Sequence, residues 1–138
     1  MDCVSFNGGT TSQTVQRLDN LWTHTCFEAF LARPSAKGYW EMNVSASGDW
    51  NLYRFSDYRT GRIEEVQAKT PKVNLRRNRV GCRCTIQIPL QPWWPHSEIP
   101  EIALTMVLED QQGNLSYWAL SHPGDKPDFH DRRGFLHW

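Results

Sequence analysis

The feature that most constrains the fold of this sequence is a series of short runs rich in aromatic and β-branched residues. Gly, Pro, Asp or Ser interrupts the chain between successive runs, and no segment shows the 3.6-residue apolar period of an amphipathic helix. We predict strands at 24–32, 38–45, 49–55, 81–90, 102–110 and 115–121. Short strands without helices are typical of an all-β protein, and we expect an antiparallel β-sandwich.

Two of the gaps between these runs predict tight hairpins. The segments "SASG" (45–48) and "DQQGN" (110–114) each contain a glycine suited to positive φ. In the run 81–90, Cys82, Cys84 and Ile86 alternate with Arg83 and Thr85. That strand should therefore bury one face and expose the other.

Length and charge limit the domain organisation and the partners. A chain of 138 residues fits one domain, and we place it at 21–138, after a loose polar lead-in at 1–20. Fifteen basic and fifteen acidic residues cancel, so we expect neither nucleic acid nor a membrane as a partner. The start of the chain lacks the pattern of a secretory signal, and no apolar stretch reaches membrane-span length, which predicts a cytoplasmic protein.

The cysteines predict neither a disulfide framework nor a metal site. Cys82 and Cys84 form a lone C-x-C, and the distant Cys26 does not give the paired spacing of a zinc site. An intracellular chain keeps its thiols reduced. We therefore expect buried, unmodified thiols, with no metal and no cofactor.

Seven tryptophans are unusual for this length, and most of them should lie in the core. Trp40 alternates with apolar residues and is predicted to be a core residue. Trp22 and Trp118 lie at strand ends, where one ring face can stay open, and Trp50 is undecided. The two strand-end tryptophans are therefore the candidates for a binding surface.

Glu28 is the most informative charged residue in the predicted strands. It stands between Cys26 and Phe30 on a face that is otherwise apolar. A carboxylate there is costly unless it is paired or used. Arg54 is a candidate partner through charge-assisted hydrogen bonds, and such a pair is either structural or part of a site.

The stretch "LSYWALSHPGDKPDFH" (115–130) places titratable side chains directly after the last strand. We expect its proline-stiffened loop to bring His122, Asp128 and His130 to the rim of a site. The alternative is that Asp128 and His130 only hold the loop, through bonds from side chain to backbone.

Three segments, "LWTHTCFEAFL", "YWEMNVSASGDWNLYRFSDYRTGR" and "LSYWALSHPGDKPDFHDRRGF", resemble bacterial DOMON-like proteins, whose domain is similar to the family-nine carbohydrate-binding modules. The resemblance implies a curved antiparallel β-sandwich with a ligand site on its face. In the sugar-binding relatives, two tryptophans enclose a sugar while a Glu, an Arg and an Asn bond its hydroxyls. An exposed aromatic ring beside carboxylates and amides suits such a ligand on physical grounds too.

The resemblance also implies particular contacts in this chain. The residues carried over are Trp22 as one wall, Glu28 as the hydroxyl acceptor, Asn43 as the amide contact and Trp118 as the second wall. Glu41 stands where relatives have an arginine, and Arg54 is the candidate to replace that cation. Relatives have several further strands before the Leu-Trp segment, which implies either missing edge strands, with an exposed pairing edge, or a shortened chain.

These observations favour a non-catalytic binding domain for a saccharide or sugar-like molecule. The alternative is a haem-binding DOMON domain whose axial ligands come from Met42, Met106, His122 and His130. An enzyme is less favoured, because no nucleophile motif, phosphate loop or complete metal triad is present. Structural calcium has candidate oxygen ligands in Asp49, Asp57 and Asp128, but these lack calcium-loop spacing.

Overall fold

The structure is a computed structural model that describes residues 14–95 and 97–137. The described chain is nearly all β, with two short 3₁₀ turns, η1 (Leu21–Thr23) and η2 (Arg132–Gly134). Its strands are β1 (Cys26–Ala32), β2 (Tyr39–Ser45), β3 (Trp50–Phe55), β4 (Ile63–Glu64), β5 (Lys72–Asn78), β6 (Gly81–Gln87), β7 (Glu101–Glu109) and β8 (Leu115–Ala119). No helix in this part of the chain is long and apolar enough to cross a membrane.

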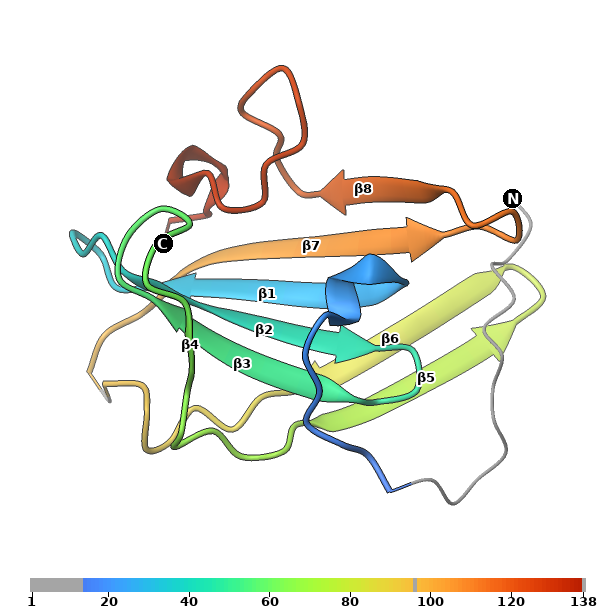
Figure 1. Cartoon of the computed structure of the whole chain (residues 1–138), viewed down its shortest axis with the longest axis horizontal. Coiled ribbons are helices and arrows are strands. Elements are labelled where there is room, and N and C mark those ends of the chain that lie inside the picture. Colours follow the sequence, from blue (N-terminus) through green and yellow to red (C-terminus); the bar gives the residue numbers. More distant parts are fainter. Residues whose placement is uncertain (1–13, 96, 138) are drawn as a thin grey trace.

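Six strands form one antiparallel sheet in the order β4-β3-β2-β1-β7-β8, and β5 and β6 pair as a separate hairpin (Figure 1). The predicted all-β antiparallel fold is confirmed, as are the six predicted strands and both predicted hairpins. Sequence reasoning missed β4 and β5. The segment "KVNLRRN" of β5 has only two apolar residues, so its alternation is weak.

The strand register divides the side chains of the six-stranded sheet between two faces. Glu28 lies opposite both Asn43 and Thr105, and Asn43 lies opposite Asn51, so this polar row crosses four strands on one face. We call it the pocket face. The other face carries Leu31, Met42, Leu52 and their alternating neighbours, and we call it the covered face.

The covered face packs into the larger apolar core. The β5–β6 hairpin contributes Val73 and Ile86, and the segment between β6 and β7 contributes Trp93 and Trp94. Trp40 meets both of these indoles, with ring centroids 5.6 and 5.4 Å away, so it packs against this core as predicted, although it is only half-buried. The undecided Trp50 is buried in the same core.

A second, smaller core occupies one end of the pocket face. Tyr39 stacks on Phe55 at 4.8 Å, and Phe30 and Phe135 complete the cluster. Gly38 makes this packing possible, since a Cβ at that position would lie 2.8 Å from the backbone oxygen of Phe55. These rings support the pocket described below.

The chain before η1 is bonded to the sheet. Arg17 donates from Nε to Asn51 Oδ1 (2.8 Å), and from Nη2 to the backbone oxygens of Leu52 (3.0 Å) and Glu65 (2.9 Å). Two backbone hydrogen bonds also join residues 16–18 to β3. The predicted lead-in thus lies partly outside the described residues, at 1–13, and is attached to the sheet at 16–18.

The described cysteines are free thiols, but their burial differs. Cys26 is buried, Cys84 is half-buried, and Cys82 is exposed, so the predicted burial is wrong for Cys82. Cys82 pairs with Arg77 beside the hairpin turn, beyond the apolar pair of Val73 and Ile86 that packs on the sheet. Cys3 lies outside the described residues.

Candidate functional site

A cavity of about 390 Å³ opens on the pocket face, within the size range of small-molecule sites. The loop after β3 and the loop after β8 meet beside it at one end of the sheet (Figure 1). The lining residues are Trp22, Glu28, Glu41, Phe55, Arg59, Arg62, Val107, Tyr117, Pro127, Phe129 and His130.

Two buried carboxyls from neighbouring strands form the floor of this pocket. Burial, reinforced by the negative charge of Glu41, raises the pKa of Glu28 to about 8, although Thr105 Oγ1 donates to Glu28 Oε2 at 3.2 Å. Burial also raises the pKa of Glu41 to about 7, against the opposing effects of Asn43, Arg62 and Arg59. At neutral pH Glu28 therefore keeps its proton and Glu41 is partly ionised. The floor presents both a donor and an acceptor.

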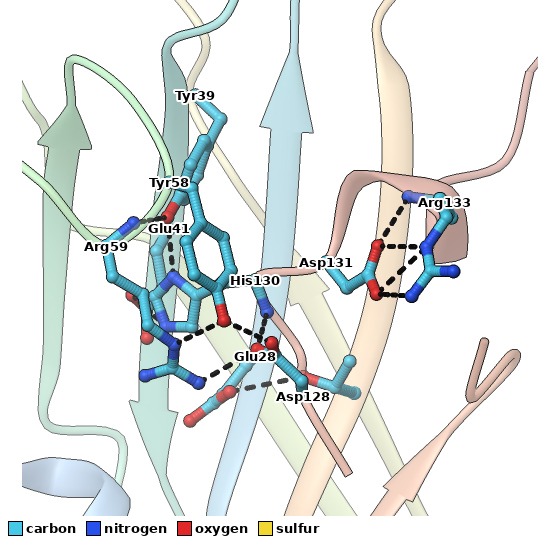
Figure 2. A network of polar contacts seen from close by, with 10 residues as sticks. Glu28, Tyr39, Glu41, Tyr58, Arg59, Asp128, His130, Asp131 and Arg133 are labelled. Atoms are coloured by element: carbon cyan, nitrogen blue, oxygen red, sulfur yellow. Dashed lines mark hydrogen bonds and ion pairs between the residues drawn. The ribbon is translucent and has the colours of Figure 1, made fainter. Parts of the chain in front are cut away.

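His130 lies between Tyr39 and Glu41 (Figure 2). Burial, together with the positive charge of Arg59, lowers the pKa of His130 to about 4, so its imidazole is neutral at pH 7. The Tyr39 hydroxyl accepts from the Arg59 backbone N–H (3.1 Å) and lies 2.6 Å from His130 Nδ1. If that hydroxyl donates to Nδ1, the remaining ring proton sits on Nε2, 3.7 Å from Glu41 Oε2. We assign this tautomer because it directs an N–H toward the carboxyl.

Asp128 joins the two loops beside the pocket. Its carboxylate accepts from the Tyr58 hydroxyl, from Arg59 Nη2 (2.8 Å) and from the His130 backbone N–H (3.1 Å) (Figure 2). Partial burial opposes ionisation of Asp128, but the bonds from Tyr58 and Arg59 outweigh it and lower the pKa. The resulting clamp holds His130 in place.

Aromatic rings form the walls. Trp22 meets Tyr53 edge to face at 6.1 Å, and the Arg62 guanidinium lies 5.2 Å from the Trp22 ring centroid. Tyr117 and Phe129 meet at 6.0 Å, and both line the cavity. The pocket thus combines ring surfaces on its sides with titratable groups on its floor.

The structure brings together several of the residues that the sequence singled out. Trp22, Glu28, Glu41 and His130 all line the cavity. Asn43 lies in the same polar row but is fully buried, and neither of its amide atoms has a partner with full hydrogen-bond geometry. Its effect on Glu41 is therefore a looser contact than a regular hydrogen bond.

Three other predicted site residues lie elsewhere. Trp118 pairs with Met106 on the covered side of the sheet and is 50% exposed, so it is not a wall of this pocket. Arg54 pairs with Trp40 on the same opposite side and is exposed, so the predicted Arg54–Glu28 pair is wrong and Thr105 bonds Glu28 instead. His122 is exposed and stacks on Phe129 at 6.3 Å without lining the pocket.

Asp128 makes the kind of contact that the loop-holding alternative expects. Its bond to the His130 backbone is one from side chain to backbone, as the loop-holding interpretation requires. The bonds from Tyr58 and Arg59 add a tie to the loop after β3.

Sequence reasoning missed seven of the lining residues, among them two cations and two aromatic rings of the pocket: Arg59, Arg62, Tyr117 and Phe129. The first two lie in the quoted segment "DYRTGR", whose Gly61 has φ 70° and whose Arg59 has φ 47°. The sequence signal for this segment was its clustering of turn-forming residues, which indicates a loop. For Tyr117, the signal was its position next to Trp118, on the opposite side of the strand.

The residues considered for haem and calcium are not gathered at one place. Met42 and Met106 belong to the face opposite the pocket, so the sheet separates them from His130. Asp49 and Asp57 flank the two ends of β3. Among the described residues, no group of three His, Cys, Asp or Glu side chains is placed to hold a metal ion.

Comparison with family models, with curated proteins and with solved structures gives no match for this chain.

Proposed function

We propose that this protein is a binding domain for a saccharide or a sugar-like small molecule, held in the pocket above Glu28 and Glu41. The observation that carries the proposal is the juxtaposition of a buried carboxyl pair with aromatic walls in a cavity of about 390 Å³. The resemblance to DOMON-like domains supports the same ligand class. A cytoplasmic location is part of the proposal, because a reducing compartment suits the free thiols.

The chemistry of the pocket matches the two surfaces of a pyranose. A sugar ring has a C–H face that stacks on aromatic rings, and Trp22 and Tyr117 supply such rings. Its hydroxyls each donate and accept one or more hydrogen bonds. A protonated Glu28 beside a partly ionised Glu41 supplies complementary groups, and the Nε2–H of His130 adds a donor.

The test is calorimetric titration with a panel of mono- and oligosaccharides. We expect Trp22→Ala to weaken binding up to about tenfold, because stacking on one ring contributes up to about 1.5 kcal/mol. Trp118→Ala is the matched control and should bind within twofold of the unmodified protein, because Trp118 lies outside the pocket. A panel without any binding, or equal losses in the two variants, would contradict the proposal.

Acid–base chemistry on the bound ligand is a second candidate, favoured by the pKa of Glu41. A carboxyl with a pKa of about 7 can hold or release a proton at neutral pH, as a general acid or base must. The test is incubation with chromogenic glycosides. Product formation that Glu41→Gln abolishes would support catalysis, and product formation equal to that of a protein-free control would exclude it.

A further inference from the structure

The charged groups of the pocket are arranged in two layers. Glu28 and Glu41 lie on the sheet, each 6% exposed, whereas Arg59 and Arg62 belong to the exposed loop after β3. Both arginines line the cavity. A ligand entering this pocket therefore meets guanidinium groups before it meets the carboxyls.

The loop that carries the two arginines has a defined conformation. The Ser56 and Thr60 backbones bond at 3.0 Å, and Arg59 adopts a left-handed φ of 47°, which is uncommon for a residue with a side chain. Gly61 follows with φ 70°. Backbone strain of this kind persists where the surrounding structure fixes it, and here the Asp128 clamp holds Arg59.

Both guanidinium groups keep donors that the described protein does not use. Arg59 engages Nη2 with Asp128 and Nε with Tyr58, which leaves Nη1 without a partner among the described residues. Arg62 contacts the ring faces of Trp22 and Tyr53 and forms no hydrogen bond or ion pair within that part of the chain. Guanidinium donors of this kind favour carboxylate, sulfate and phosphate groups.

The charge on the floor does not cancel these cations. Asp128 balances Arg59, and Glu28 is protonated at neutral pH, so Arg62 is opposed by Asp19, whose pKa it helps to lower, and by a partly ionised Glu41. An additional negative charge placed at the mouth is thus attracted to Arg62 rather than repelled by the floor. A neutral ligand would leave the Arg62 donors to water.

We infer that the ligand is an acidic saccharide, with its sugar ring between Trp22 and Tyr117 and its carboxylate at Arg62 and Nη1 of Arg59. This inference rests on the proposed function and names the ligand class for the same pocket. It makes Arg62 the residue that discriminates between acidic and neutral sugars. The hydroxyls of the same sugar then face the carboxyl floor.

The test compares glucuronic acid with its methyl ester, which has the same ring and hydroxyls but no charge. We expect the acid to bind about tenfold more tightly at pH 7, the difference that one charged hydrogen bond commonly makes. Arg62→Gln should reduce this preference to about twofold or less. Arg54→Gln is the matched control, on the opposite side of the sheet, and should leave the preference unchanged.

The outcomes separate this inference from the proposed function. Equal binding of acid and ester would overturn the inference while leaving a sugar-binding pocket. A preference that survives Arg62→Gln would overturn the role of Arg62. Failure of the acid, the ester and the neutral sugar panel to bind would overturn both proposals.

Dependence on pH gives a second, independent readout. The titratable and charged groups facing the ligand are Glu28 from β1, Glu41 from β2, Arg59 and Arg62 from the loop after β3, and His130 from the C-terminal loop. Asp128 and Tyr39 lie behind them, and Asp19 lies close enough to Arg62 for that cation to lower its pKa, so Asp19 stays ionised between pH 6 and 8. Lowering the pH from 8 to 6 protonates the floor carboxyls and leaves His130 neutral. Affinity for glucuronate should rise over this interval. A fall in affinity would count against an anionic ligand.

Discussion

The two faces of the six-stranded sheet are built from the same strands and differ in what covers them. On the covered face, Met42 and Leu52 pack under the β5–β6 hairpin and two indoles, and the buried carboxyl of Glu65 accepts a hydrogen bond from Trp40 Nε1 at 3.2 Å. On the pocket face, the residues next to them in sequence include Glu41 and Asn43, which are as deeply buried but polar. Burial alone therefore does not distinguish core from site in this molecule.

The two faces therefore affect the stability of the fold in opposite ways. Apolar side chains on the covered face contribute stability in proportion to the area they bury. The carboxyls of the pocket face are held in a region that disfavours their charge, which costs stability at neutral pH. Groups retained at such a cost are candidates for function.

The largest expected effect comes from opening the covered face. Leu52→Ala removes a side chain that is 0% exposed and should lower the free energy of unfolding by about 3 kcal/mol, through lost burial and a cavity. Urea denaturation followed by circular dichroism measures it. Arg54→Ala, two residues along the same side of the same strand but exposed, should change stability by less than about 0.5 kcal/mol. Similar changes in the free energy of unfolding for Leu52→Ala and Arg54→Ala would contradict the expected difference between a packed and an exposed position.

Substitution of a buried carboxyl on the pocket face should raise the free energy of unfolding rather than lower it. The pKa of Glu28 is raised from 4.5 to about 8 in the fold, so the unfolded chain loses its proton first and stability falls as pH rises between these values. Glu28→Gln removes this penalty and should raise the free energy of unfolding by roughly 2 kcal/mol at pH 8, with little effect near pH 4.

Urea denaturation of the Gln variant at pH 4, 6 and 8 checks both the sign and the trend. Arg54→Ala, on the opposite side of the sheet, leaves the pocket carboxyls in place, so it is the control and should not show this trend. Destabilisation by Glu28→Gln at pH 8 would mean that the ionised carboxylate is stabilised in the fold.

A smaller effect is expected from the clamp at the edge of the pocket face. Asp128→Asn keeps the shape of the side chain but weakens its bonds with Tyr58 and Arg59, and should cost about 1 kcal/mol. Because Asp128 raises the pKa of His130, its loss should lower that pKa further. Chemical denaturation and NMR titration of the His130 ring measure the two quantities. An upward shift of the His130 pKa would contradict the assigned electrostatics.

The smallest effect is expected at Trp118. It is half exposed where the β5–β6 hairpin does not reach, and Trp118→Ala should change stability by less than about 1 kcal/mol. The same variant serves as the binding control. A loss comparable to that of Leu52→Ala would show that the covered core extends to β8.

Local alternation was sufficient to predict much of the fold. It located six strands, and it identified Glu28 as a buried acid because Cys26 and Phe30 flank it on the same face. The position of Trp22 just before that strand placed it correctly beside the pocket. These predictions depend only on neighbours within one or two strands.

The rest of the site is formed by contacts between residues that are far apart in the sequence. Whether Trp118 or Tyr117 reaches the pocket is decided by the register of β1 with β7 and of β7 with β8, and a shift of one residue exchanges the two. The bond between Tyr58 and Asp128 joins residues 70 positions apart. The turn residues around Arg59 and Arg62 indicate a loop, but no pattern within either loop predicts that the two loops meet at the pocket.

The attachment of Arg17 has a practical consequence for where this molecule can be cut. Its guanidinium is the hydrogen-bond donor for the carbonyls of Leu52 and Glu65 and for the amide oxygen of Asn51. A fragment starting at Leu21, where the aromatic pattern begins, would lose all three bonds and one flank of β3. The part of the chain that is hydrogen-bonded to β3 reaches back to Gln16, and expression fragments or domain fusions should preserve that stretch.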